Sequence, residues 1–257
     1  MSYIPSVNIE HGITDDFQYI VTPNTKNVWG NIVSSFHDGI HSFTIIGTYG
    51  TGKSSFLAAL QRDLLKRTSV LVENHNVFGT DKFDFLNIVG DYASLSSLLA
   101  AKLDLAEYAA SDEILTALGR KYEAAKKAGK FLLVVIDEFG KILEHAAANN
   151  PEQELYFLQK LAEFINAPKR NAILLTTLHQ NFSSYSYKLT DAQRNEWTKV
   201  KGRFKEIVFV EPIEQLLQLT ANRLDNGVAV PTEAAQDRKS TRLNSSHRLT
   251  SRMPSSA

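Results

Sequence analysis

One loop constrains this chain more than any other stretch of its 257 residues. A short apolar run at 43–46 leads into the sequence GTYGTGKS at 47–54, and apolar positions at helical spacing follow. Glycines in such a loop let backbone N–H groups curve around a phosphate chain, because no Cβ intervenes. A helix start adds unpaired N–H donors and the positive end of the helix dipole. The spacing G-x-x-x-x-G-K-S between a strand and a helix therefore predicts a phosphate-binding loop.

The same loop carries groups suited to the charges of a nucleoside triphosphate. Lys53 is placed to neutralise the β- and γ-phosphates, and the Ser54 hydroxyl is placed to ligate Mg²⁺. A glycine-rich turn that carries Lys-Ser by chance is the alternative interpretation. No N/T-K-x-D segment follows the core, which disfavours GTP relative to ATP. The expected nucleotide-binding residues are Gly47, Thr48, Tyr49, Gly50, Thr51, Gly52, Lys53, Ser54 and Ser55.

A second chemical signal follows the apolar run FLLVVI at 131–136, where Asp137 and Glu138 stand side by side. A continuous apolar run is typical of a strand buried on both faces of a parallel sheet. Such sheets hold ligands at the carboxyl ends of their strands. We expect Asp137 to orient Mg²⁺ and Glu138 to take the proton from an attacking water. The alternative is a strand that ends in a solvated acidic turn.

Strands and helices alternate along the rest of the chain, which predicts an α/β fold with a parallel sheet covered on both sides. The helical patterns fall near 25–38, 53–66, 94–127, 141–148, 151–166 and 191–201. The expected strands are 43–46, 69–78, 131–136, 172–177 and 206–210, with 83–89 as a possible extension of the sheet.

Composition places the chain among ordinary globular proteins, with 43% hydrophobic and 22% charged residues. No apolar run reaches membrane-spanning length, and the N-terminus lacks the basic and apolar regions of a secretion signal. Cysteine is absent, which fits a reducing compartment. These features predict a cytoplasmic protein without membrane contact.

The last stretch, 237–257, has a different character. Its residues 237–247 and 251–257 back-translate, in one frame, into two blocks of a widely used short-read sequencing adapter. We therefore interpret 237–257 as an artefactual disordered tail on a truncated fragment; a natural basic, serine-rich disordered tail is the alternative. Without this tail, 23 basic and 27 acidic residues remain, a net charge of −4. That balance gives no indication of nucleic-acid binding, although it does not exclude it.

With these motifs in place, residues 20–224 resemble the AAA+ type of P-loop ATPase, in its bacterial origin-recognition-like or STAND-like branches. GTYGTGKS at 47–54 resembles the family's Walker A motif, and Ile136-Asp137-Glu138 resembles Walker B. The resemblance implies a three-layer P-loop NTPase core with a parallel sheet flanked by helices. It divides the chain into an N-terminal lead-in and helix (1–40), the ATPase core (41–211) and the start of a truncated helical lid (212–236).

The resemblance also assigns two further residues. His179, with Thr177 and Gln180 as competing candidates, follows the fourth strand where the family keeps a polar sensor of the γ-phosphate. A buried histidine that caps the strand is the alternative. Arg203 lies in the segment before the fifth strand that carries the family's arginine finger, which acts in a neighbouring subunit's site. Its alternative is a surface arginine paired with Glu196 or Glu206.

Together these features predict an ATPase that hydrolyses Mg-ATP with Lys53, Glu138, His179 and Arg203 as catalytic residues. The work is expected to be conformational change in a homo-oligomer, in other protein subunits or in attached domains. An ATP-dependent signalling or defence switch with slow hydrolysis is the second interpretation. A phosphotransferase is a third, which the Asp-Glu pair disfavours.

Overall fold

The structure is a computed structural model that describes residues 7–10, 17, 19–66 and 68–210. The predicted lid and tail, 212–257, lie outside these residues. The described strands are β1 (Ser42–Ile46), β2 (Phe83–Val89), β3 (Phe131–Asp137), β4 (Ala172–Leu178) and β5 (Lys205–Val208). The helices are α1 (Pro23–His37), α2 (Lys53–Lys66), α3 (Leu95–Lys102), α4 (Ser111–Lys127), α5 (Phe139–Ala148), α6 (Pro151–Ile165) and α7 (Asp191–Lys201), with a short 3-10 helix, η1 (Phe182–Ser186).

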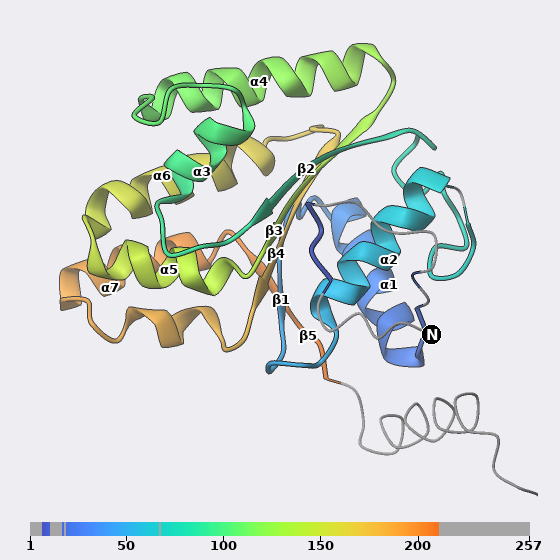
Figure 1. Cartoon of the computed structure of the whole chain (residues 1–257), viewed down its shortest axis with the longest axis horizontal. Coiled ribbons are helices and arrows are strands. Elements are labelled where there is room, and N and C mark those ends of the chain that lie inside the picture. Colours follow the sequence, from blue (N-terminus) through green and yellow to red (C-terminus); the bar gives the residue numbers. More distant parts are fainter. Residues whose placement is uncertain (1–6, 11–16, 18, 67, 211–257) are drawn as a thin grey trace, which may run out of the picture. The chain divides into compact units, whose positions relative to one another are not determined.

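The five described strands form one parallel sheet in the order β2-β3-β4-β1-β5. Every residue of β3 and β4 is buried, as their continuous apolar sequences require for central strands. Along β3, alternate side chains enter two separate hydrophobic cores. Helices α1 and α2 cover one face of the sheet, and α3 to α7 cover the other (Figure 1). The prediction of an α/β core with a parallel sheet between helices is confirmed.

The predicted strand at 69–78 is wrong, because these residues form bends and turns. Leu71 and Val72 are buried as expected of a strand, yet their backbone N–H groups donate to the carboxylate of Asp63, which is fully buried in α2. For Val72 the distance to Oδ2 is 3.0 Å. Backbone donors that are satisfied by a side chain are not available for a sheet ladder. Phe83–Val89 takes the place beside β3 instead.

The predicted helical stretch at 94–127 is two helices rather than one. Helix α3 begins after Ser94, whose hydroxyl caps the backbone N–H of Ser97, and it ends before Leu103. Asp104 then adopts a left-handed backbone conformation (φ 56°), which interrupts the helical path before α4.

One carboxyl group on α6 gives the fold a testable pH dependence. Glu154 is buried, and no described residue bonds its Oε2 atom. Burial raises the pKa of this carboxyl, opposed by a hydrogen bond from the Leu95 backbone. A raised pKa means that the folded chain holds the proton more tightly than the unfolded chain. The stabilisation is therefore complete below the ordinary glutamate pKa of about 4.3 and is lost as pH rises through the folded value.

We accordingly expect Glu154→Gln, which cannot ionise, to gain stability relative to the wild type as pH rises. Thermal unfolding at pH 5 and pH 8 measures this: the melting temperature of the variant minus that of the wild type should be larger at pH 8. Glu152→Gln, at an exposed position in the same helical turn, is the control. A difference that is the same at both pH values would contradict the prediction.

Candidate functional site

The loop between β1 and α2 is held at its first glycine by two neighbouring backbone segments. The N–H of Gly47 donates to the carbonyl of Leu178 at the end of β4 (3.1 Å), and the N–H of Phe209 donates to Ile46 (2.6 Å). A Cβ on Gly47 would lie 2.4 Å from the carbonyl oxygen of Phe209, so no other residue fits here without a backbone shift. Gly50 and Gly52 have φ angles of +76° and +91°, which side chains disfavour.

Lys53 begins α2 and points back into this loop. Its side chain is buried, and Nζ donates to the carbonyl oxygens of Gly47 (2.6 Å) and Thr48 (2.9 Å). Burial lowers the pKa of the Lys53 amine, while the negative charges of Asp137 and Glu138 oppose that change. The loop is thus curled around an ammonium group whose partners within the loop are two neutral carbonyl oxygens. Ser54 and Ser55 follow it in the first turn of α2, half-buried.

Asp137 ends β3 as a buried carboxylate with a fixed orientation. Its Oδ1 accepts from the Thr177 hydroxyl (2.6 Å) and from the backbone N–H of Glu138 (3.0 Å). Thr177, one of the competing sensor candidates, is therefore a partner of this aspartate. Both of these hydrogen bonds go to Oδ1, and no described residue donates to the other oxygen, Oδ2. Carboxylate and hydroxyl oxygens suit Mg²⁺, so Asp137 and Ser54 fit the predicted metal.

The described residues contain no group of three or more His, Cys, Asp or Glu side chains that would hold a metal alone.

Glu138 occupies a left-handed backbone conformation (φ 53°) between β3 and α5. Its N–H donates to the Thr177 hydroxyl oxygen (2.9 Å). A Cβ on Gly90 would lie 2.4 Å from the Glu138 carbonyl oxygen, so the end of β2 supports this turn closely. The Glu138 carboxylate forms an ion pair with Lys141, one helical turn further along α5. A strained, firmly supported backbone of this kind is common where a side chain must be aimed.

His179, directly after β4, lies against the loop. Its ring stacks on that of Tyr49, with centroids 3.5 Å apart and 20° between the planes, and its Nδ1 lies 3.5 Å from Lys53 Nζ. Burial lowers the pKa of His179, and the positive charge of Lys53 lowers it further. A neutral ring follows from this at pH 7, and Nδ1 facing an ammonium group is then its acceptor nitrogen.

Tyr185 also belongs to this region, which the sequence patterns did not predict. Tyr185, in η1, is buried, and the position of its hydroxyl leaves no room for a side chain at 140: a Cβ on Gly140 would lie 2.4 Å from that oxygen. Burial raises the pKa of Tyr185, while the backbone N–H groups of His179 and Gln180 oppose the rise. Tyr185 thus joins the start of α5 to the end of β4. Neither Tyr185 nor Gly140 stands in a recognisable sequence motif, so no signal in the sequence indicates this contact.

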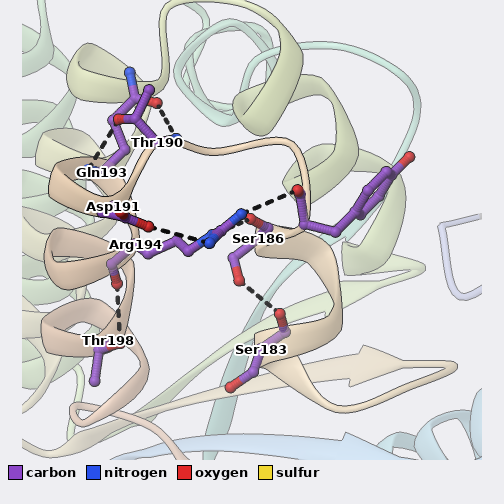
Figure 2. A network of polar contacts seen from close by, with 8 residues as sticks. Ser183, Ser186, Thr190, Asp191, Gln193, Arg194 and Thr198 are labelled. Carbon is purple, nitrogen blue, oxygen red and sulfur yellow. Dashed lines mark hydrogen bonds and ion pairs between the residues drawn. The ribbon is translucent and has the colours of Figure 1, made fainter.

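An arginine holds the segment that carries Tyr185 against α7 (Figure 2). Arg194 binds the Asp191 carboxylate (3.2 Å) and donates to the backbone carbonyls of Ser186 (3.5 Å) and Tyr187 (3.4 Å). The segment therefore has a defined path although its sequence is polar and rich in serine.

Arg203 does not join the other predicted residues. It precedes Lys205, which pairs with Phe43 at the beginning of β1, whereas the glycine-rich loop follows the end of that strand. Its guanidinium donates to Glu163 Oε1 on α6 (2.8 Å) and to the carbonyl of Lys199 (2.9 Å). Neither Glu196 nor Glu206 is its partner. The structure therefore brings Lys53, Asp137, Glu138 and His179 to one edge of the sheet and leaves Arg203 at the other.

Among the described residues, none of the helices combines the length and the apolar character needed to cross a bilayer.

The sheet order, the loop between β1 and α2 and the acidic end of β3 define an α/β fold of the P-loop type. The ORC2 protein of Aeropyrum pernix has a similar structure in its ADP form, with a TM-score of 0.52, and in its ADPNP-ADP complexes, with a TM-score of 0.50. In both cases identity is 16%, over 82% of this chain and 55% of the other. Cdc6p from Pyrobaculum aerophilum is 18% identical over 85% of this chain and 54% of that one, with a TM-score of 0.48.

This chain spans about half the length of those solved structures. No protein-family model matches the sequence, and no curated protein matches it. The likeness at this level of identity establishes the fold, and the predicted resemblance to AAA+ ATPases is confirmed to that extent.

Proposed function

We propose that this chain binds Mg-ATP at the loop between β1 and α2 and hydrolyses it to ADP and phosphate. The observation that carries the proposal is the meeting of four groups at the carboxyl edge of the sheet. The Lys53 ammonium lies at the start of α2, the Asp137 and Glu138 carboxylates at the end of β3, and the His179 ring at the end of β4. Phosphoryl transfer to water depends mainly on positioning and charge neutralisation, which these groups supply.

Each residue has a task that follows from its present contacts. Lys53 exchanges the carbonyl oxygens of Gly47 and Thr48 for β- and γ-phosphate oxygens, which are better partners because they are charged. Glu138 takes the proton of the attacking water. His179, neutral, holds a γ-phosphate oxygen or that water at one of its ring nitrogens. Mg²⁺ next to Asp137 and Ser54 would supply the remaining charge neutralisation on the phosphates.

Titration of the protein with ATP in the presence and absence of Mg²⁺, followed by assay of released phosphate, tests the proposal. Micromolar to millimolar binding with turnover that requires Mg²⁺ is expected. Absence of ATP binding to the folded chain would overturn the proposal.

Arg203 leads to a separate proposal about assembly. An arginine at the opposite edge of the sheet cannot serve its own loop, so it would act only in the site of a neighbouring copy. We expect Arg203→Ala and Lys53→Ala each to lack turnover alone and to regain part of it when mixed, because mixed assemblies contain some complete sites. Phosphate release measured across mixing ratios tests this. Activity of Arg203→Ala alone equal to the wild type would show that Glu163 is simply its structural partner.

The second interpretation, a switch that holds an assembled state with slow hydrolysis, is favoured by one contact. The Glu138 carboxylate already has a cationic partner in Lys141, which would keep turnover low. Mass measurement with ATP separates the alternatives: a switch changes its oligomeric mass on ATP binding with little phosphate release.

A further inference from the structure

Thr177 and His179 stand two positions apart at the end of β4, and they contact different groups. His179 lies beside the Lys53 ammonium, whereas the Thr177 hydroxyl contacts the acidic end of β3. In the pairing of β3 with β4, Thr176 lies opposite Ile136, so the next residue, Thr177, comes beside Asp137. Thr177 is only 1% exposed. The register of the sheet therefore sets its place against the aspartate.

The hydrogen bonds of Thr177 account for its hydroxyl completely. Oγ1 donates its one proton to Asp137 Oδ1 (2.6 Å) and accepts the backbone N–H of Glu138 (2.9 Å). The same N–H lies 3.0 Å from Asp137 Oδ1, so the three groups form a closed triangle. A hydroxyl whose proton is bound to a charged acceptor has none left to donate to a phosphate oxygen. Thr177 is thereby separated from His179 as a candidate for contact with the γ-phosphate.

We propose that Thr177 is a positioning residue, which orients the Asp137 carboxylate and holds the turn at Glu138, and that it does not contact the nucleotide. Two donors on Oδ1 limit rotation of the carboxylate and so determine how Asp137 is presented to Mg²⁺. The left-handed backbone of Glu138 (φ 53°) needs such support from its surroundings. The inference deepens the proposed function and rests on it.

The preceding threonine on the same strand provides a matched comparison. Thr176 is also buried, but its hydroxyl lies 3.0 Å from that of Thr44 and donates to the carbonyl of Phe43 (3.1 Å). Both of these partners belong to β1 rather than to the acidic end of β3. The two threonines share residue type and burial, and they differ in what their hydroxyls hold.

Calorimetric titration with ATP and with ADP at a series of Mg²⁺ concentrations tests the inference. Thr177→Val keeps the shape of the side chain and removes the hydroxyl. The Mg²⁺ concentration that gives half of the full gain in ATP affinity should rise about 10- to 100-fold, as is typical when a group that orients a metal ligand is lost. Without Mg²⁺, the ATP affinity and the ratio of ATP to ADP affinities should stay at their wild-type values. Thr177→Ser, which keeps the hydroxyl, should restore the wild-type response to Mg²⁺.

Thr176→Val is the control: it should melt at a lower temperature than the wild type and respond normally to Mg²⁺. Thr177→Ala, a second variant without the hydroxyl, should show the same shift as Thr177→Val and replaces it if the valine protein does not fold. A folded variant without the hydroxyl that responds to Mg²⁺ like the wild type would overturn the inference. So would a lowered ratio of ATP to ADP affinities, which would place the hydroxyl on the γ-phosphate, or a Thr177→Ser protein that behaves like Thr177→Val. The proposed function is judged separately, by whether the wild type binds Mg-ATP at all.

Discussion

We expect the Glu138→Gln variant to bind Mg-ATP as tightly as the wild type and to hydrolyse it at least about 100-fold more slowly. The amide has nearly the same shape as the carboxylate, but it cannot accept the proton of the attacking water. The backbone contacts of Glu138 with Thr177 and Asp137 do not involve its side chain, so the turn should be preserved. Equilibrium binding and single-turnover phosphate release on the same samples measure both quantities.

The control for this variant is Glu144→Gln, which removes an exposed carboxylate further along α5. It should retain wild-type turnover. Hydrolysis by Glu138→Gln at the wild-type rate would mean that another group activates the water, and the assignment of Glu138 as the base would then be wrong.

The second large effect concerns nucleotide binding. Lys53→Ala should weaken ATP binding about 10- to 100-fold, which corresponds to roughly 1.4–2.8 kcal/mol. That range fits the loss of charge-assisted hydrogen bonds to phosphate, each worth about 1.5–3 kcal/mol. In the free protein the same substitution removes the two bonds to Gly47 and Thr48, so the loop also loses the group around which it is curled.

Titration with a fluorescent ATP analogue measures this affinity, and circular dichroism checks that the variant is folded. Lys66→Ala is the matched control, because it removes an exposed lysine at the far end of the same helix. If the Lys53→Ala variant is folded and binds ATP with unchanged affinity, the phosphates do not bind at Lys53.

Much of this arrangement could be predicted because local sequence dictates it. The backbone conformation of the loop at 47–54 requires glycines at fixed positions. The apolar run before Asp137 identifies a central strand. Parallel strands then bring their carboxyl ends to one edge, which is why residues as distant as Lys53 and Glu138 could be expected together.

The features that the sequence did not predict depend on contacts between residues that are distant in the sequence or that follow no fixed sequence pattern. The apolar residues near 71 resemble a strand in the sequence. Nothing in the sequence indicates that the carboxylate of Asp63 accepts hydrogen bonds from their backbone N–H groups. The stacking of Tyr49 on His179 joins residues 130 positions apart. Arg203 has Glu163 as its partner because α6 and α7 pack together, which requires the tertiary structure.

The clamp on Gly47 has a mechanical consequence. The glycine-rich loop begins at the peptide group between Ile46 and Gly47, whose N–H donates to Leu178 at the end of β4 and whose carbonyl accepts from Phe209 after β5. Phe209 is a single residue away from the end of the described chain, and the polypeptide continues beyond it. Tension applied to that continuation would reach the first glycine of the loop through one peptide hydrogen bond, without passing through any side chain. A displacement of the backbone at Phe209 would therefore shift the first glycine of the loop, where we propose that the nucleotide binds.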